Sequence, residues 1–295
     1  MKTLLLNNYE ANVSNEDSKA IKINMKAKKS LGQNFLTSQS VIDKIIEIAN
    51  LDLKDIVLEI GPGKGILTQT LLGTGIVGKV ISVEKDITLI PFLQEKFSEE
   101  IRMGKLILVY DDILDFDFQK YGLESGNYKI VANIPYYITG RFLRKILSSE
   151  IQPSKMVLLI QKEVADRIAK DKKESLLSIS VKAYGKPKYI QTVKAGNFNP
   201  APKVDSAIFE ISNISKKIFY QTNEKKFFEI IKVGFSHKRK FLIGNLGIFA
   251  KKEKLQSAFR QAGISDTARA EDVALEQWKT LAQNLYPNVK VSSIY

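Results

Sequence analysis

Apolar residues along the chain follow two periods, one typical of helices and the other typical of buried strands. Between residues 41 and 49 they recur at spacings of three and four, which predicts an amphipathic helix. Short apolar runs elsewhere predict strands buried on both faces of a parallel sheet. These runs are Ile56–Ile60, Val80–Val83, Leu106–Val109, Lys129–Ala132 and Met156–Ile160. Helical stretches such as 142–147 lie between several runs, so we predict an α/β fold with helices on both faces of the sheet.

The second half of the chain contains two strand-like segments and then a long helical segment. Residues 189–193 and 207–211 alternate as strands do, with no clear helix between them, which predicts an antiparallel pair at the edge of the sheet. Apolar spacing over residues 223–285 is helical throughout. We therefore predict three parts. They are a flexible N-terminal tail (1–25), an α/β domain (26–212) and a small helical domain (213–295).

The amino-acid composition excludes some kinds of active site and favours one kind of partner. The 295 residues include no cysteine and a single histidine, which excludes a thiolate nucleophile and a multi-histidine metal site, so we predict no metal. The net charge is +13, and residues 186–260 hold 16 Lys and Arg against five Asp and Glu. This excess favours a polyanionic partner, and Lys238, Arg239 and Lys240 are the candidate phosphate contacts. No apolar run is long enough to cross a membrane, which predicts a cytoplasmic protein.

A glycine-rich turn follows the first predicted strand, with Gly61 and Gly63 at alternating positions. Glycines let the backbone turn sharply and approach a ligand closely. Glu84 ends the next strand, where a carboxylate can accept two hydrogen bonds from a ribose. Asp112 follows the strand after that and can accept from an adenine amine, although a helix-capping role competes. No phosphate-binding Lys-Ser/Thr pair follows the glycines, so the pattern favours S-adenosylmethionine and methyl transfer.

A second motif, Asn133-Ile134-Pro135-Tyr136, follows the strand at 129–132. An adenine amine is a poor nucleophile because its lone pair is delocalised into the ring. The Asn133 amide oxygen and the carbonyl of Ile134 or Pro135 can accept its two N–H groups and free that lone pair. Pro135 stiffens the turn, and Tyr136 offers a face on which a purine can stack. The motif therefore predicts transfer to an adenine amine by positioning and electrostatics.

Several separate segments resemble the ribosomal RNA adenine N6-dimethyltransferase family, over residues 28 to 285. They are Lys29–Leu36, the glycine turn, Asn133–Tyr136, Phe198–Ser206 and Arg269-Ala270-Glu271. The resemblance implies a Rossmann-like class I methyltransferase with a small all-helical C-terminal domain. Within the family, the chain is most similar to the bacterial small-subunit enzymes. This implies dimethylation of two adjacent adenosines in the 3′-terminal hairpin loop of 16S rRNA, in a pre-30S particle, by a monomer.

The family's functional residues carry over by position in these motifs. Implied cofactor contacts fall on Asn34, Leu36, Gly61, Glu84, Asp112 and Asn133. The target base is implied to lie between Tyr136 and Phe198, with Asn133 holding its amine. Phe241-Leu242, after the basic run, departs from the Thr-Leu pair common in the family and puts only RNA docking detail in doubt.

Three alternatives stay open from the sequence. The first is an adenine N6-methyltransferase that acts on a single adenine of large-subunit (23S) rRNA. The second is a non-catalytic rRNA-binding assembly factor, although docking alone has no need of Gly61, Glu84 or Asn133. The third is a nicotinamide dehydrogenase, disfavoured because Ile66 stands where a dinucleotide loop needs glycine or alanine.

Overall fold

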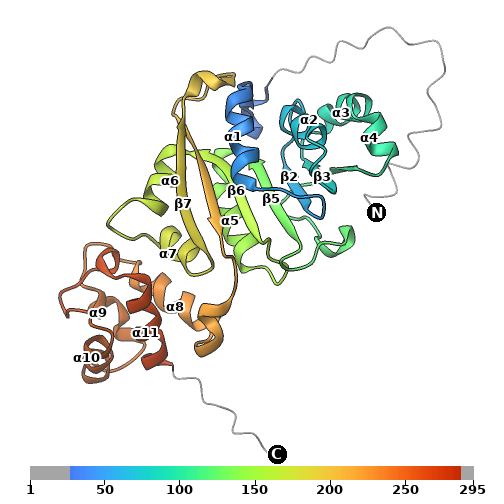
Figure 1. Ribbon diagram of the computed structural model, residues 1–295. Coiled ribbons are helices and arrows are strands. Elements are labelled where there is room, and N and C mark those ends of the chain that lie inside the picture. The colour runs from blue at the N-terminus through green and yellow to red at the C-terminus, as the bar shows by residue number, and fades with distance from the viewer. Residues whose placement is uncertain (1–26, 287–295) are drawn as a thin grey trace, which may run out of the picture.

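The computed structural model describes residues 27–286, so the predicted N-terminal tail lies outside the described residues. A twisted sheet with helices on both faces is followed by a bundle of short helices (Figure 1). This confirms the predicted α/β fold with a helical C-terminal part.

The sheet has seven strands in the order β4-β3-β2-β5-β6-β9-β7. The first five of these are parallel, and β9 runs antiparallel to both of its neighbours. The predicted antiparallel pair is therefore confirmed, with β7 at the edge and β9 inside the sheet. The strand bounds are β2 (Ile56–Ile60), β3 (Lys79–Glu84), β4 (Leu106–Tyr110), β5 (Tyr128–Asn133), β6 (Lys155–Gln161), β7 (Lys186–Val193) and β9 (Ser206–Ser212).

Helices cover both faces of this sheet. On one face lie α1 (Gln39–Ala49), α2 (Ile66–Gly73), α3 (Ile90–Lys96) and α4 (Ser98–Arg102). On the other lie α5 (Thr139–Ser148), α6 (Lys162–Ala169) and α7 (Leu176–Lys182). Because side chains alternate along a strand, Val57 packs on the α1 face and Leu58 on the α5 face, and both are fully buried. The central strands are apolar because they are buried on both sides.

The C-terminal part consists of α8 (Glu224–Gly234), α9 (Leu242–Asn245), α10 (Lys252–Gln261) and α11 (Leu275–Leu285). They surround an apolar cluster of their own, in which Trp278, Phe227 and Phe259 are completely buried. Helix α7 belongs to both parts. Its Ile179 lies in the helical cluster, whereas Val181 lies in the core beneath the sheet. This shared helix fixes where the C-terminal part meets the α/β part.

Short 3₁₀ helices connect several of these elements. They lie at Lys29–Leu31, Ile87–Leu89, Gln119–Tyr121, Tyr136–Ile138, Ala195–Asn197, Lys217–Gln221, Leu246–Ile248 and Ala270–Asp272. A separate two-stranded ladder joins β1 (Phe35–Leu36) to β8 (Phe198–Asn199), antiparallel, with Leu36 opposite Phe198. The ladder ties the segment that precedes α1 to the loop between β7 and β9.

Parallel strands place their carboxyl ends at the same edge of a sheet, and this edge is where ligands bind in open α/β folds. Here β2 ends before Gly61, β3 ends at Glu84, β4 ends before Asp111 and β5 ends at Asn133. The sequence motifs therefore meet at one edge although they are far apart along the chain.

Candidate active site

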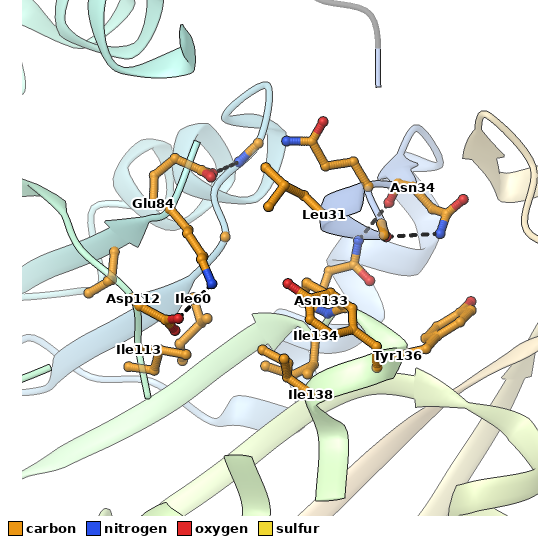
Figure 2. A pocket seen from close by; sticks show the side chains of 18 of the residues that line it. Leu31, Asn34, Ile60, Glu84, Asp112, Ile113, Asn133, Ile134, Tyr136 and Ile138 are labelled. Carbon is orange, nitrogen blue, oxygen red and sulfur yellow. Dashed lines mark hydrogen bonds and ion pairs between the residues drawn. The ribbon is translucent and has the colours of Figure 1, made fainter. Parts of the chain in front are cut away.

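A pocket opens at the carboxyl ends of β2, β3, β4 and β5 (Figure 2). Its wall is formed by five stretches of chain that follow one another around the opening. They are Leu31–Phe35, Ile60–Gly63 without Pro62, Val83–Lys85, Asp111–Ile113 and Asn133–Ile138. Of the predicted site residues, the pocket brings together Asn34, Gly61, Gly63, Glu84, Asp112, Asn133, Pro135 and Tyr136.

Glu84 is a buried carboxylate at one side of this pocket. Its Oε2 accepts a hydrogen bond of 3.1 Å from the Gly63 amide (Figure 2). Its Oε1 accepts one of 2.7 Å from the Asp86 amide. Burial raises its pKa, and the two amides partly offset that rise. Each oxygen has a second lone pair, so the carboxylate can still accept hydroxyl donors from a ligand in the pocket.

Asp112 lies next to Glu84 along the wall and has two roles in the structure. Its Oδ1 accepts from the Leu114 amide at 3.0 Å, as in a turn cap, and its Oδ2 accepts from the Lys85 ammonium at 2.6 Å. Burial pushes the pKa of Asp112 upward, but Lys85 and the Leu114 amide hold it below the ordinary value. The capping role and a place on the pocket wall therefore coexist.

The glycine turn has the backbone that its sequence predicts. Gly61 and Gly63 have φ values of 67° and 59°, which L side chains rarely adopt. If Gly61 carried a Cβ, the nearest atom beyond its chain neighbours would be the Asn133 carbonyl oxygen, 4.0 Å away. A larger residue at this position would therefore project into open space in the pocket. A Cβ on Gly63 would lie 2.8 Å from the Phe35 ring. The absence of a side chain at Gly61 thus leaves room for a ligand, and its absence at Gly63 allows the Phe35 ring to pack against the turn.

The Asn133 side chain has a fixed orientation. Its Nδ2 donates to the backbone carbonyl of Asn34 at 2.9 Å, and the Asn34 Nδ2 donates to the Gly32 carbonyl at 3.2 Å. A carbonyl only accepts, so it must face the NH₂ end of the Asn133 amide. The Asn133 Oδ1 accepts no hydrogen bond from any of the described residues. The amide oxygen is therefore available on the pocket wall.

The turn after Asn133 decides which backbone carbonyl is available. The Pro135 carbonyl accepts from the Ile138 amide at 3.1 Å and is thereby used in the 3₁₀ turn. The Ile134 amide donates to the Leu159 carbonyl, also at 3.1 Å, whereas the Ile134 carbonyl accepts no hydrogen bond within the described range. Of the two carbonyls left open by the sequence, the structure favours that of Ile134.

Tyr136 is half-buried on the pocket wall, and its hydroxyl lies 2.7 Å from the Ser206 Oγ. Burial raises its pKa, so the hydroxyl stays protonated at neutral pH. Ser206 is completely buried at the start of β9. Sequence reasoning assigned it no role, although it ends one of the family segments. The structure shows that it holds the Tyr136 ring.

Two predicted residues do not line the pocket. Phe198 is 4% exposed and packs in the apolar cluster of the α1 face, because β8 pairs it with Leu36. The predicted second stacking face is therefore not present in this structure. Leu36 is also buried, and it lines a small adjoining hollow with Gly61, Gly63 and Asn133. Leu36 therefore lies beside the glycine turn but does not line the main pocket.

Asp86 holds the segment before α1 against the pocket, a role that sequence reasoning missed. Its buried carboxylate accepts from the Lys28 ammonium at 2.6 Å and from the Gln33 side-chain amide at 2.8 Å. It also accepts from the amide and hydroxyl of Thr88. Burial raises the pKa of Asp86, but these donors outweigh it and bring the pKa to about 2. The carboxylate is thus charged at any physiological pH.

The basic turn, defined here as Lys238, Arg239 and Lys240, lies between α8 and α9 with all three side chains exposed. Lys238 lines a hollow between the two parts of the molecule, together with Arg167 of α6. Sequence reasoning missed Arg167 because a single arginine on a helix gives no distinctive pattern. Glu174 and Glu271 line the same hollow, so its charge is mixed, and the exposed basic turn itself is the surface that suits an anionic partner.

Within residues 27–286, no group of three or more His, Cys, Asp or Glu side chains is arranged to hold a metal ion. Over the same residues, no helix combines the length and apolar character that crossing a bilayer requires.

Sequence comparisons agree with this geometry. Residues 24–286 match the family described as Ribosomal RNA adenine dimethylase. The chain is 41% identical over 260 residues to Ribosomal RNA small subunit methyltransferase A of Dehalococcoides mccartyi, covering 87% of this chain and 88% of that protein. It is 35% identical over 269 residues to the protein of the same name from Clostridium botulinum, covering 90% and 96% of the two chains.

Solved structures share the fold. A dimethyladenosine transferase from Plasmodium falciparum is 26% identical, with a TM-score of 0.71 over 84% of this chain and 95% of that chain. The 23S rRNA methyltransferase ErmE is 25% identical, with a TM-score of 0.66 over 85% and 99% of the two chains.

Proposed function

The chain belongs to the ribosomal RNA adenine dimethylase family, and from that premise we propose that it transfers methyl groups from S-adenosylmethionine to N6 of adenosines in small-subunit rRNA. The finer proposal is that its targets are two adjacent adenosines in the 3′-terminal hairpin loop, each dimethylated. One observation carries the proposal. The nitrogen of the Asn133 amide is committed to Asn34, which leaves the amide oxygen available to an adenine amine.

The pocket fits the cofactor on chemical grounds. A Cβ on Gly61 would occupy open space at its wall, which is the room that a ligand close to the backbone needs. Glu84 would accept the ribose hydroxyls, Asp112 would face the adenine, and Asn34 and Gly63 would complete the wall. S-adenosylmethionine, when bound, supplies a methyl group activated by the positive charge of its sulfonium.

The residues of this chain contribute position and electrostatics. The Asn133 Oδ1 and the Ile134 carbonyl would accept the two N–H groups of the adenine amine, which favours a pyramidal nitrogen with a free lone pair. An amide oxygen is too weak a base to remove a proton at neutral pH, so Asn133 orients the amine and does not deprotonate it. Tyr136 would stack on the purine, with its ring held by Ser206.

RNA docking would use the helical part of the chain. We propose that residues 26–212 form the catalytic domain and residues 213–295 the docking domain, with the basic turn on rRNA phosphates. The excess positive charge of residues 186–260 suits this role. The partner would be a pre-30S particle in the cytoplasm, and the enzyme would act as a monomer.

The relatives favour the small subunit over the large one. The two small-subunit methyltransferases cited above are 41% and 35% identical to this chain, whereas the 23S rRNA methyltransferase is 25% identical. The pocket itself does not separate the two substrates, because both reactions need the same cofactor and the same adenine amine. The distinction has to come from docking.

An assay with methyl-labelled S-adenosylmethionine tests the proposal. Purified small and large ribosomal subunits that lack the modification are each incubated with the protein. Labelled N6,N6-dimethyladenosine in the small-subunit RNA supports the proposal. Label in the large-subunit RNA alone would assign the chain to the alternative substrate, and cofactor binding without any transfer would indicate an assembly factor.

A further inference from the structure

A second cavity, of about 630 Å³, lies between the α/β part and the helical part. We call it the α5–α8 groove, because residues of α5 and α8 line it, and we call the part lined by residues of α7 its floor. Figure 1 shows where these three helices lie in the fold. The floor is apolar and includes Leu176, Leu177 and Val181. The motifs that build the methylation pocket contribute no residue to this groove.

The groove and the methylation pocket are lined by neighbouring positions of one segment of chain. Ile138 lines the pocket, and Gly140, two residues later, lines the groove. The groove then follows α5 to Ser148, a distance on the order of 12 Å at the rise of an α-helix. A polymer chain with one residue in the pocket can therefore continue into the groove along a single helix.

Its rim carries positive charge without matching acids. Arg144, Lys225 and Lys232 all line the groove, and all three side chains are exposed. Among the described residues that line the groove, Glu224 is the one acid. It is already engaged, because Oε1 accepts from the Tyr184 hydroxyl at 2.6 Å and Oε2 lies 3.3 Å from the Lys216 ammonium.

The α8 wall also presents a fixed aromatic ring. Phe228 lies between Lys225 and Lys232 on one face of α8, at spacings of three and four residues. Its ring is stacked on Tyr184, with centroids 5.6 Å apart and an interplanar angle of 19°, and Phe227 packs against it edge-on. The ring is half-buried and lines the groove, so its orientation is set before any ligand binds.

A basic groove with an aromatic ring matches the chemistry of single-stranded nucleic acid, in which bases stack and phosphates pair with cations. We propose that the α5–α8 groove binds unpaired nucleotides of the substrate rRNA that flank the methylated adenosines. One base would pack on Phe228 and the apolar floor, and the adjoining phosphates would pair with Arg144, Lys225 and Lys232. This inference rests on the proposed function and assigns a second contact site to the same substrate.

The test compares two double charge reversals in the full-length protein. Lys225→Glu/Lys232→Glu alters the groove, and Lys54→Glu/Lys105→Glu makes the same charge change at exposed positions outside the basic stretch 186–260. Methylation of small subunits is measured against substrate concentration, and S-adenosylmethionine affinity is measured by calorimetry. The groove variant is expected to raise KM for the subunit about 10-fold more than the control variant does, with cofactor affinity unchanged.

Two further measurements separate RNA from a protein partner. Binding to protein-free small-subunit rRNA should weaken in the groove variant and show a shallower dependence on salt, because phosphate contacts are lost. Phe228→Leu keeps an apolar side chain but removes the stacking face, and it should weaken RNA binding about 10-fold when binding is measured well below the melting temperature of the variant.

Equal KM values for the two double variants would overturn the groove proposal. So would weaker binding to intact subunits with unchanged binding to free rRNA, which would indicate a ribosomal protein as the occupant. If the wild-type protein transfers no methyl group to either subunit, the proposed function itself fails, and that outcome is distinct from both.

Discussion

The side-chain nitrogen of Asn133 lies 2.9 Å from the backbone carbonyl oxygen of Asn34 and donates a hydrogen bond to it. The two residues are 99 positions apart in sequence, one at the end of β5 and the other just before β1. This contact decides which end of the Asn133 amide is left for a ligand. It also couples the Asn133 side chain to the segment 31–35, which forms one wall of the same pocket.

Replacing Asn133 with Ala should abolish most methyl transfer and leave RNA binding intact. Removal of one preorganised hydrogen-bonding group from an active site costs about 100-fold or more in kcat. Asn133→Asp should also fail, because a carboxylate cannot donate to the Asn34 carbonyl and would repel it. Single-turnover methylation and RNA binding are measured for both variants. Transfer at the wild-type rate in Asn133→Ala would remove this residue from the mechanism.

Asp86 should control cofactor affinity through the segment that it holds. Asp86→Ala removes the acceptor for Lys28 and Gln33, so the pocket wall at residues 31–35 loses its anchor. Because hydrogen bonds to a charged group contribute about 1.5–3 kcal/mol, we expect cofactor affinity to fall at least about 10-fold. The loss should appear mainly in KM for S-adenosylmethionine, with a smaller change in kcat.

Lys28→Met serves as the matched control for Asp86. The Lys28 side chain is 41% exposed, and partly exposed ion pairs contribute little. This variant should therefore change cofactor affinity only slightly. An effect as large as that of Asp86→Ala would mean that the ion pair alone holds the wall, contrary to the shared role of Gln33 and Thr88.

Methylation should depend on the ring of Tyr136 more than on its hydroxyl. Tyr136→Phe keeps the stacking face and should reduce methylation only a few-fold, whereas Tyr136→Ala should reduce it by about 10- to 100-fold. Ser206→Ala leaves the Tyr136 hydroxyl without its partner, so the double variant Tyr136→Phe/Ser206→Ala should be no worse than Ser206→Ala alone. Strict additivity in this cycle would show that the two residues act independently.

The titration of Glu59 should lower the free energy of unfolding as the pH rises. Its Oε2 accepts from Thr68 and Ser82, its Oε1 has no partner in the described structure, and burial raises its pKa from 4.5 to about 7. Between these two values the folded protein binds more protons than the unfolded chain, so the free energy of unfolding falls as pH increases. The contribution is complete below pH 4.5 and lost above about pH 7.

Glu59→Gln keeps an acceptor for Thr68 and Ser82 but does not titrate. Urea unfolding at pH 5 and pH 8 should show a wild-type loss up to about 3 kcal/mol larger than the loss in the variant. Parallel pH profiles for the two proteins would contradict the assignment of this titration to Glu59.

Much of the fold could be predicted because its signals are local. The runs in β2, β3, β4, β5 and β6 are apolar on both faces, as is typical of strands buried in a parallel sheet. The position of β9 inside the sheet could not be predicted. Strand order depends on contacts between segments far apart in the chain, and alternation alone does not encode it.

Some residues of the site could likewise be predicted from local sequence signals, and others could not. Gly61, Glu84 and Asn133 each follow a recognisable strand, so their meeting at one edge was predictable. Asp86, Gln33 and Ser206 were not, because each acts through a partner that is distant in sequence and has no motif of its own. Phe198 was placed on the pocket by resemblance, whereas its pairing in β8 buries it.

A crystal structure with S-adenosylhomocysteine and an RNA hairpin carrying the target adenosines tests the role of Asn133 most directly. We expect the flipped adenine to lie against Tyr136, with its N6 within hydrogen-bonding distance of both the Asn133 Oδ1 and the Ile134 carbonyl. The ribose of the cofactor should lie on Glu84. An adenine amine that contacts neither acceptor, or a cofactor bound away from Glu84 and Gly61, would contradict it.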